Sequence, residues 1–219
     1  MRFKSIRIPR STYEGTKQAQ NILKAARKVF IRNGAAAFST RRVAKEAKLG
    51  LGSVQHVFPT TDSLLTAMFE DLVTSYDVAY QERMAKLPFN GEARLSAALD
   101  YLLNDICNPE TRHMFFGFWV LSCHNRLVET LMQQAYTHHQ NNVATFIGAV
   151  RADLTDDECR MLATQVIALI DGSMIFTAPK TKLIPRARFI RALKSTIWSM
   201  ISRPSAPRSE LPMRPNALP

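Results

Sequence analysis

Apolar residues recur three or four positions apart along most of this chain, which is the spacing of an amphipathic helix. The first such stretch contains Ala19, Ile22, Ala26 and Val29, and similar stretches continue to about residue 202. No segment alternates apolar and polar residues as a half-buried β-strand does. We therefore predict an all-α fold of about nine helices.

Residues that favour helix caps mark several of the expected helix ends. Gly34 follows the first apolar stretch, where glycine suits the positive φ of a helix C-terminus. Asn108 and Pro109 read as an N-cap and a proline at the first helical position. Thr155 and Glu158 have the spacing of a capping box. These signals divide the apolar pattern into separate helices.

The positive charge of the chain is concentrated in its first quarter. Residues 1–61 contain 13 Lys and Arg but only two acids, whereas the remainder contains 16 basic and 16 acidic residues. The formal net charge of +11 therefore belongs to one basic module joined to a neutral partner. A cationic surface confined to one end is typical of proteins that meet a polyanion.

Length and composition indicate a globular protein. The 219 residues are enough for one small and one medium domain, and 46% of them are hydrophobic. Three cysteines are too few for a disulfide framework and favour a reducing compartment. The longest apolar stretch, Val166 to Ala178, is interrupted by Asp171 and is shorter than the ~20 residues that a membrane span needs. We predict a cytoplasmic protein without a membrane partner.

Residues Ser39 to Phe58 predict two short helices around a glycine-containing turn, which is the pattern of a helix-turn-helix. Val43, Ala47 and Val54 are spaced to form a small core between the two helices. The residues between these apolar positions are mostly polar or basic, as a surface that enters the major groove of DNA requires.

The sequence of this motif resembles the tetracycline-repressor (TetR) family of transcriptional regulators. The matching residues run from Phe38 to Ala47, from Leu49 to Pro59 and from Asp62 to Leu64, and the preceding helix from Ile22 to Phe30 also matches. The resemblance implies an N-terminal three-helix DNA-binding domain followed by a helical domain that binds a ligand and dimerises.

We therefore expect four segments. Residues 1–16 form a basic arm that lies along phosphates or enters a minor groove, and residues 17–68 form the helix-turn-helix domain. Residues 69–202 form the ligand-binding and dimerisation domain. Residues 203–219 hold five of the 11 prolines and are expected to be disordered.

The resemblance implies a set of DNA contacts on and around the second helix of the motif. Gln55 is expected to read adenine through its amide, Leu51 to touch a thymine methyl, and Ser53 to reach a base edge or a phosphate. The remaining residues are expected mainly to contact the DNA backbone, which positions the helix without reading sequence. The full set is Thr40, Arg41, Arg42, Leu51, Ser53, Gln55, His56 and Thr61.

Some positions of this region depart from the family pattern. Lys48 occupies the turn position that is usually glycine, and Gly50 stands where Ser or Thr usually caps the recognition helix. Leu51 takes a place often held by a polar residue, and Thr61 replaces a lysine that commonly meets a phosphate. These departures affect the contact geometry rather than the motif.

A cluster of aromatic and polar residues in the second domain predicts a small-molecule site. The aromatic run around Trp119, together with Ile170 to Gly172, is similar to the branch of choline and betaine regulators. The expected effector site consists of Tyr76, Phe115, Trp119, His124 and Asp171. An aromatic box suits a cation, and a lipid-like or aromatic ligand fits equally well.

The last two expected helices are apolar around most of their circumference, so they need neighbours beyond their own domain. We predict that they form the two-fold contact of a homodimer, as the family resemblance implies. The expected contact residues are Leu162, Val166, Leu169, Ile190, Leu193 and Ile197. The alternative is a monomer with one thick core.

The expected function is a sequence-specific regulator, by family default a repressor, that binds a palindromic operator in double-stranded DNA and is released by a small-molecule effector. Two alternatives stay open: a regulator without an effector pocket, and a helical enzyme or small-molecule binding protein. The chain has no Gly-rich phosphate loop and no G-x-S-x-G. His138 and His139 are adjacent and therefore poor co-ligands on a helix. No catalytic residue, cofactor or metal is predicted.

Overall fold

The computed structural model describes residues 16–87, 90–177 and 184–203. Within these ranges the chain forms nine α-helices and one 3-10 turn, without a strand. The prediction of an all-α fold with about nine helices is therefore confirmed. The predicted arm, apart from Thr16, and the proline-rich tail, apart from Arg203, lie outside the described residues.

Three helices form the N-terminal part, which we call the reading head. They are α1 (Lys17–Asn33), α2 (Thr40–Ala47) and α3 (Leu51–Val57), with the 3-10 turn η1 (Ala35–Ala37) after α1. The Thr16 and Ser39 side chains accept hydrogen bonds at the starts of α1 and α2. Gly34 closes α1 at φ 76° and ψ 168°, a conformation that essentially only glycine adopts.

Six further helices form the rest of the described chain. They are α4 (Thr61–Ala85), α5 (Gly91–Asp105), α6 (Pro109–Ser122), α7 (Arg126–Val150), α8 (Asp156–Ser173) and α9 (Arg186–Ser202). The predicted capping box at Thr155 and Glu158 is present at the start of α8, and Asn108 caps α6 with Pro109 in its first turn. Asn90 and Asn125 cap α5 and α7 in the same way.

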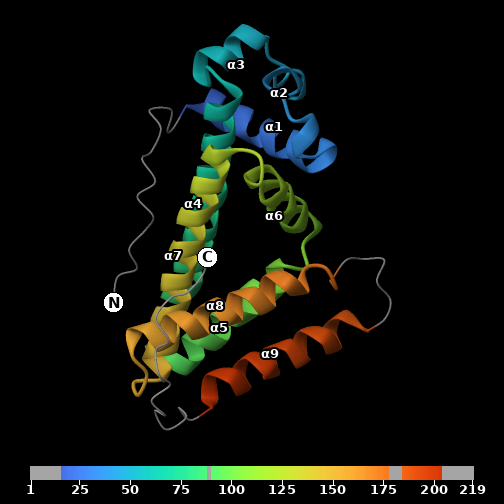
Figure 1. Ribbon diagram of the computed structural model, residues 1–219. Coiled ribbons are helices and arrows are strands. Elements are labelled where there is room, and N and C mark those ends of the chain that lie inside the picture. The colour runs from blue at the N-terminus through green and yellow to red at the C-terminus, as the bar shows by residue number, and fades with distance from the viewer. Residues whose placement is uncertain (1–15, 88–89, 178–183, 204–219) are drawn as a thin grey trace, which may run out of the picture.

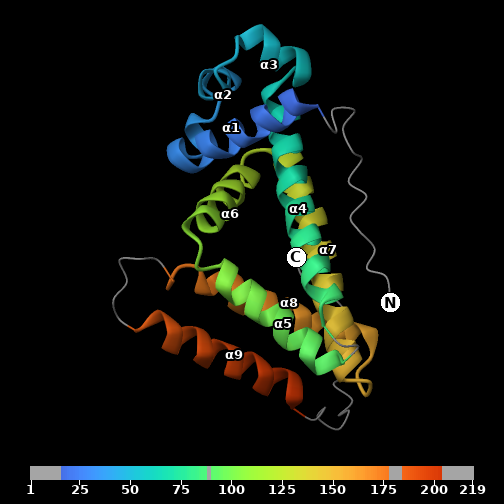
Figure 2. The same cartoon turned by 180° about the vertical axis from the view of Figure 1, so that it is seen from behind.

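The helices surround a triangular frame with the reading head at one corner (Figures 1 and 2). The long helices α4 and α7 run side by side from the head to the far end of the molecule. There α8 packs against α7, and α9 packs against α5 and α8. Helix α6 slants across the frame between α1 and the distal helices (Figure 1).

The apolar interior consists of two clusters, and α6 links the reading head to the rest of the first one. Phe118 of α6 is fully buried, with its ring stacked on Phe30 of α1 at 4.8 Å and edge-on to Phe69 of α4 at 4.8 Å. Gly117 allows this approach, because a Cβ there would lie 2.4 Å from the Phe30 ring. The predicted domain boundary between residues 68 and 69 falls inside α4 and stays a prediction.

Candidate functional site

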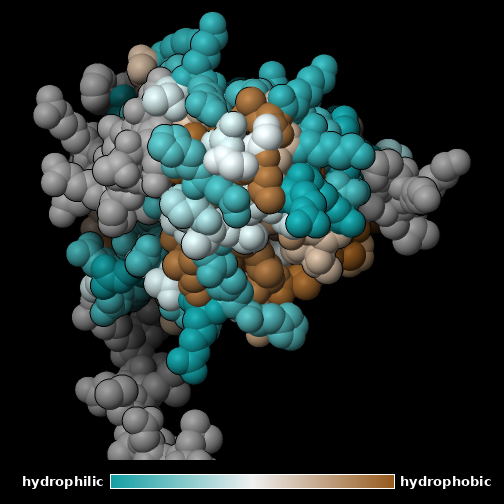
Figure 3. Space-filling model, turned by 90° about the horizontal axis from the view of Figure 1, so that it is seen from above, coloured by the Kyte–Doolittle hydropathy of each residue, from teal (hydrophilic) through white to brown (hydrophobic). Residues whose placement is uncertain are grey.

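Helix α3 presents a polar face to solvent and an apolar face to the reading head. Val54 and Val57 are buried in the head core, whereas Ser53, Gln55 and His56 are exposed. Seen from the head end, the surface is largely hydrophilic with a few apolar patches (Figure 3). The exposed side chains of α3 are therefore free to meet the edges of bases in a groove.

The other predicted DNA-contact residues differ in their accessibility. Arg41 and Arg42 are exposed on α2, and Arg42 donates a hydrogen bond to the Ala37 carbonyl at 2.7 Å. Thr40 is buried, and its hydroxyl oxygen lies 3.1 Å from that of Thr61 at the start of α4. This pair joins the helix-turn-helix to the long helix, so Thr40 holds the head in place and has little surface to offer DNA.

The two departures in the turn have visible structural consequences. Lys48 adopts the left-handed conformation at φ 57°, which a residue with a Cβ occupies at a cost. Gly50 begins α3 without a side-chain cap. Leu51 is half-buried against the head core, so much of its side chain is occupied by packing.

A second site is a cavity of about 130 Å³ lined by residues of α4, α5, α6, α7 and α8. Its walls are mostly aromatic or aliphatic, with a few polar groups between them, as in many small-molecule sites. The aromatic residues are Phe69, Tyr76, Tyr80, Tyr101, Phe115 and Tyr136. The polar and ionisable residues are Asp77, Asp105, His138, His139, Asn142 and Asp171.

Two carboxylates of the cavity are each held by a tyrosine. The Tyr76 hydroxyl donates to Asp105 at 2.7 Å, and the Tyr136 hydroxyl donates to Asp171 at 2.7 Å. Thr111, in the first turn of α6, also donates to Asp105 at 3.1 Å. Among the described residues, no Lys, Arg or His makes an ion pair with Asp105 or Asp171.

Burial shifts the proton equilibria of these groups. It raises the pKa of Asp105 and of Asp171 above the ordinary value, while the hydrogen bonds that each carboxylate accepts oppose the shift. Burial, reinforced by the adjacent carboxylates, raises the pKa of Tyr76 and Tyr136, so both hydroxyls stay neutral donors. The cavity therefore holds two carboxyl groups with raised pKa values in aromatic surroundings.

The two histidines have different partners. The His138 Nε2 atom lies 3.2 Å from Asp77 and 3.0 Å from the Asn142 amide nitrogen. Burial, together with the adjacent His138, lowers the pKa of His139 to about 4. His139 is therefore neutral near pH 7 and does not compensate the carboxylates.

A helix-turn-helix followed by a helical domain with a cavity, which we call the sensor cavity, is an arrangement found in known families. Residues 22–68 match the family described as bacterial regulatory proteins, tetR family. Residues 91–202, about half of the chain, match the C-terminal domain of BetI-type transcriptional repressors. The chain belongs to the TetR family of bacterial transcription regulators.

Two curated relatives are both described as the HTH-type transcriptional regulator BetI. The protein of Vibrio campbellii is 22% identical over 153 residues, which cover 69% of this chain and 75% of that protein. The protein of Pectobacterium atrosepticum is 26% identical over 133 residues, which cover 60% of this chain and 67% of that protein.

Solved structures of transcriptional regulators share the fold. One from Pseudomonas aeruginosa PAO1 has a TM-score of 0.74 at 13% identity, covering 87% of this chain and 95% of that one. Another, from Saccharomonospora viridis in complex with choline, has a TM-score of 0.70 at 19% identity, covering 82% and 95%. At these identities the likeness concerns the fold alone.

Three of the five predicted effector residues of this TetR-family chain line the cavity. Tyr76, Phe115 and Asp171 line it. Trp119 does not, because it lies on the surface of α6 and is 46% exposed. It contacts Tyr136 of the cavity wall through a hydrogen bond of 3.1 Å and a tilted ring contact. His124 also lies outside, since it is exposed in the turn between α6 and α7.

Sequence reasoning missed the second carboxylate of the cavity. Asp105 is the last residue of α5, and Tyr101 lies one turn before it on the same helix. Neither residue is part of a motif or of the aromatic run around Trp119. The four-residue spacing of Tyr101 and Asp105 was the one available signal, and it is common in helices.

The predicted dimer residues fall into two groups in this TetR-family chain. Val166, Leu193 and Ile197 are buried within the chain's own core, so they are not available to a second subunit. Leu162, Leu169 and Ile190 are half-buried. Helix α7 packs on α8, so part of the apolar circumference of α8 belongs to the chain's own core, and the interface itself stays a prediction.

Three further observations concern metal ligands, cysteines and membrane-spanning helices. Among the described residues, no group of three or more His, Cys, Asp or Glu is arranged to hold a metal ion. Cys107 and Cys159 are buried and free, and Cys123 is exposed. Within the part of the chain that the structure describes, no helix is long and apolar enough to cross a membrane.

Proposed function

We propose that this TetR-family regulator represses transcription as a homodimer on a palindromic operator and is released when a small organic cation occupies the cavity. Regulators of this family bind DNA, dimerise and bind small-molecule effectors. The observation that carries the choice of ligand is the pair of partly buried carboxylates, Asp105 and Asp171, in a cavity walled by tyrosines.

The charge balance of the cavity favours a cation. Asp105 and Asp171 are partly removed from water without a basic partner among the described residues, and a charge in such a place costs free energy unless a counter-ion pairs with it. The faces of Tyr76, Tyr101 and Tyr136 add cation–π attraction. The Saccharomonospora viridis neighbour, of the same fold, was solved with choline, which is a cation of this kind.

Helix α3 is the proposed recognition helix. Its exposed Gln55 is suited to a bidentate contact with adenine, and the nearby Ser53 and His56 are also exposed. Arg41 and Arg42 on α2 are proposed to hold phosphates. Two such heads in a dimer read half-sites separated by a whole number of helical turns.

The proposed dimer surface is the exposed side of α8. Met161 on α8 and Ile175 just after its end are each more than 60% exposed, and Ala168 and Gly172 are exposed between them in the sequence. Because Ala168 and Gly172 are small, a second α8 approaches closely there in an isologous two-fold contact. The half-buried Leu162, Leu169 and Ile190 are proposed to border it.

Helix α6 is the proposed connection between cavity and head. Its first turn reaches Asp105 through Thr111, and its third turn reaches Asp171 through Trp119 and Tyr136. Between these two points Gly117 and Phe118 pack on Phe30 of α1. A bound cation attracts the two carboxylates, so it changes the contacts that hold both ends of α6. The position of the reading head, which packs on α6, changes with them.

The ligand proposal is tested by calorimetric titration of the full chain with choline and with 3,3-dimethyl-1-butanol, its neutral isostere. Choline is expected to bind at least about tenfold more tightly than the alcohol, because only the cation pairs with the carboxylates. The variant Asp171→Asn keeps the shape of the side chain and should remove most of this preference. The matched control is Glu82→Gln, which neutralises an exposed acid on α4.

Equal binding of choline and the alcohol, or unchanged choline affinity in Asp171→Asn, would contradict a charge-selective cavity. Binding of neither compound, in protein that still selects a duplex sequence, would favour the regulator without an effector pocket.

A further inference from the structure

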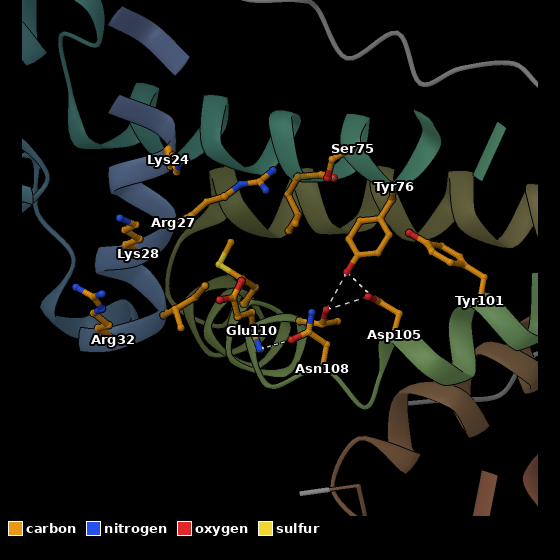
Figure 4. Close-up of a pocket in the computed structure, with 14 residues that line it drawn as sticks. Lys24, Arg27, Lys28, Arg32, Ser75, Tyr76, Tyr101, Asp105, Asn108 and Glu110 are labelled. Carbon is orange, nitrogen blue, oxygen red and sulfur yellow. Dashed lines mark hydrogen bonds between the residues drawn. The ribbon is translucent and has the colours of Figure 1, made fainter. Parts of the chain in front are cut away.

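A groove of about 540 Å³ lies at the junction of the reading head and the helices behind it (Figure 4). Helix α1 forms one side, and α4, α5 and the start of α6 form the other. The volume is within the range of small-molecule sites, and the groove is distinct from the sensor cavity. Four residues, among them Tyr76 and Asp105, belong to the wall that the two spaces share.

The α1 side of the groove is cationic. Lys24, Arg27, Lys28 and Arg32 follow one another along this helix and all line the groove. Lys28 and Arg32 approach Glu46 only to 3.7 and 3.6 Å. Among the described residues Lys24 has no ion pair.

Arg27 is the cation whose hydrogen bonds are least satisfied. Its Nη2 atom lies 2.8 Å from Asp71, yet neither Nη2 nor Nε makes a hydrogen bond, although both atoms are buried. These two atoms lie on one edge of the guanidinium, and that edge matches the two oxygens of a carboxylate. After a small movement of the Arg27 side chain toward the groove, both donors could bind the carboxylate of a ligand there.

The opposite side of the groove carries negative charge. Asp105 at the end of α5 and Glu110 in the first turn of α6 both line it, next to the ring of Tyr76. A simple anion held by α1 would be repelled by these two acids, and a simple cation held by the acids would be repelled by α1. A molecule that carries both charges complements both sides.

Apolar residues complete the lining. Ile31 of α1, Leu72 of α4 and Met114 of α6 leave aliphatic surface between the two charged sides. We propose that this groove is a second small-molecule site, which takes an α-amino acid with an apolar side chain. Its carboxylate pairs with Arg27 and the neighbouring lysines, and its ammonium group pairs with Asp105 and Glu110.

Such a ligand braces the head against the helices behind it. It contacts α1 on one side and α5 and α6 on the other, so it stabilises one orientation of the reading head. The groove shares Asp105 with the cation-responsive cavity, but the inference goes beyond that cavity and its test is separate, since amino-acid binding is measured without DNA and without choline.

The test is a thermal-shift survey of the full chain with each of the twenty common amino acids at about 5 mM, followed by calorimetry of those that bind. Leucine, N-acetyl-leucine and leucinamide form the matched probe set, because each analogue lacks one of the two charges. We expect leucine or another apolar amino acid to bind, and each analogue to bind at least about tenfold more weakly.

Two exposed positions separate binding from folding. Lys28→Gln and Glu110→Gln should each weaken leucine binding several-fold without changing the melting temperature of the free protein. Arg27→Gln should weaken it further, although the loss of the Asp71 contact also affects the fold. The controls Lys45→Gln and Glu92→Gln remove like charges from exposed positions outside the groove and should change nothing.

Three results would overturn the proposal. The first is that none of the twenty amino acids binds. The second is that N-acetyl-leucine binds as well as leucine, which indicates an anion site only. The third is that Lys28→Gln weakens binding to duplex DNA but leaves amino-acid binding intact, which assigns the α1 cations to DNA phosphates.

Discussion

The reading head and the sensor cavity are built from contacts of different range along the chain. The head is formed by three consecutive helices between Lys17 and Val57, which pack on one another. The cavity depends on pairs such as Tyr76 with Asp105 and Tyr136 with Asp171, which are 29 and 35 residues apart. A motif in the sequence therefore identifies the head, whereas only the folded chain reveals the cavity.

The two regions also differ in how they use charge. The head exposes cations such as Arg41 and Arg42 to solvent, where they attract a polyanion from a distance. The cavity holds Asp105 and Asp171 partly buried among aromatic rings, where we propose that they select a partner by contact. In the proposed function, one chain thus separates long-range attraction of DNA from short-range selection of an effector, with α6 between the two regions.

The largest expected effect tests whether the two regions are independent. Phe118→Ala removes a fully buried ring that packs on Phe30 of the head and on Phe69 of α4. We expect the free energy of unfolding to fall by about 3–5 kcal/mol, because a cavity replaces the ring. Urea denaturation monitored by circular dichroism measures the change.

The matched control for this variant is Val120→Ala, which truncates an exposed residue on the same helix. Its unfolding free energy should change by no more than about 0.5 kcal/mol. A similarly small effect of Phe118→Ala would mean that the head and the sensor helices do not share a core.

The next effect concerns how the head reads DNA. Gln55→Ala should reduce discrimination at one base pair of the operator by about 1–3 kcal/mol, because a bidentate amide contact is lost. Selection of bound sequences from random duplexes at two salt concentrations measures the preference separately from phosphate attraction. A uniform loss of affinity for all sequences would assign Gln55 to the backbone instead.

A third prediction uses the raised pKa of the cavity carboxylates. A cation pairs with the ionised form, so choline affinity should fall as the pH decreases through the pKa of Asp105 and Asp171. Because burial raises both pKa values, this loss begins at a higher pH than for an exposed aspartate. Below the pKa of a carboxyl group that must be ionised for binding, choline affinity falls by about tenfold per pH unit.

Calorimetry between pH 7.5 and 5 measures this dependence. His139, whose pKa is about 4, stays neutral over that range, but His138 and Asp77 also face the cavity. Repeating the series with His138→Asn separates the contribution of the His138 and Asp77 pair from that of Asp105 and Asp171. Choline affinity that is independent of pH in both proteins would contradict pairing with buried carboxylates.

The smallest expected effect lies in the turn of the head. Lys48→Gly should raise the unfolding free energy by about 0.5–1 kcal/mol, because glycine adopts the left-handed conformation without strain. The matched control Lys45→Gly places glycine inside α2 and should lower stability by about 1 kcal/mol. Loss of stability in both variants would show that the Lys48 side chain contributes more than its backbone costs.

Much of the fold follows from local signals in the sequence. The N-caps Ser39, Asn108 and Thr155 and the C-terminal glycine Gly34 act within a few residues, so helix ends are readable without tertiary structure. The polar side of α3, including Gln55, is readable for the same reason, since it follows from the periodicity of one helix.

The sensor cavity was only partly readable because its chemistry arises from tertiary contacts. The sequence predicts Asp171 as an effector residue because it lies within an apolar helix. It does not predict Asp105, since nothing near Asp105 in the sequence shows that Tyr76 lies against it. Trp119 was overvalued because an aromatic run does not show which side of α6 faces inward. Val166 was overvalued in the same way, because its neighbours belong to the same subunit.

The most direct measurement is the affinity of the full chain for its selected operator duplex, by fluorescence anisotropy, without choline and with choline at saturation. Coupling between cavity and head predicts a loss of about 5- to 150-fold in operator affinity for the natural protein and little change for Asp171→Asn. Operator affinity that stays the same while calorimetry shows the cavity filled with choline would contradict the claim that the two regions communicate.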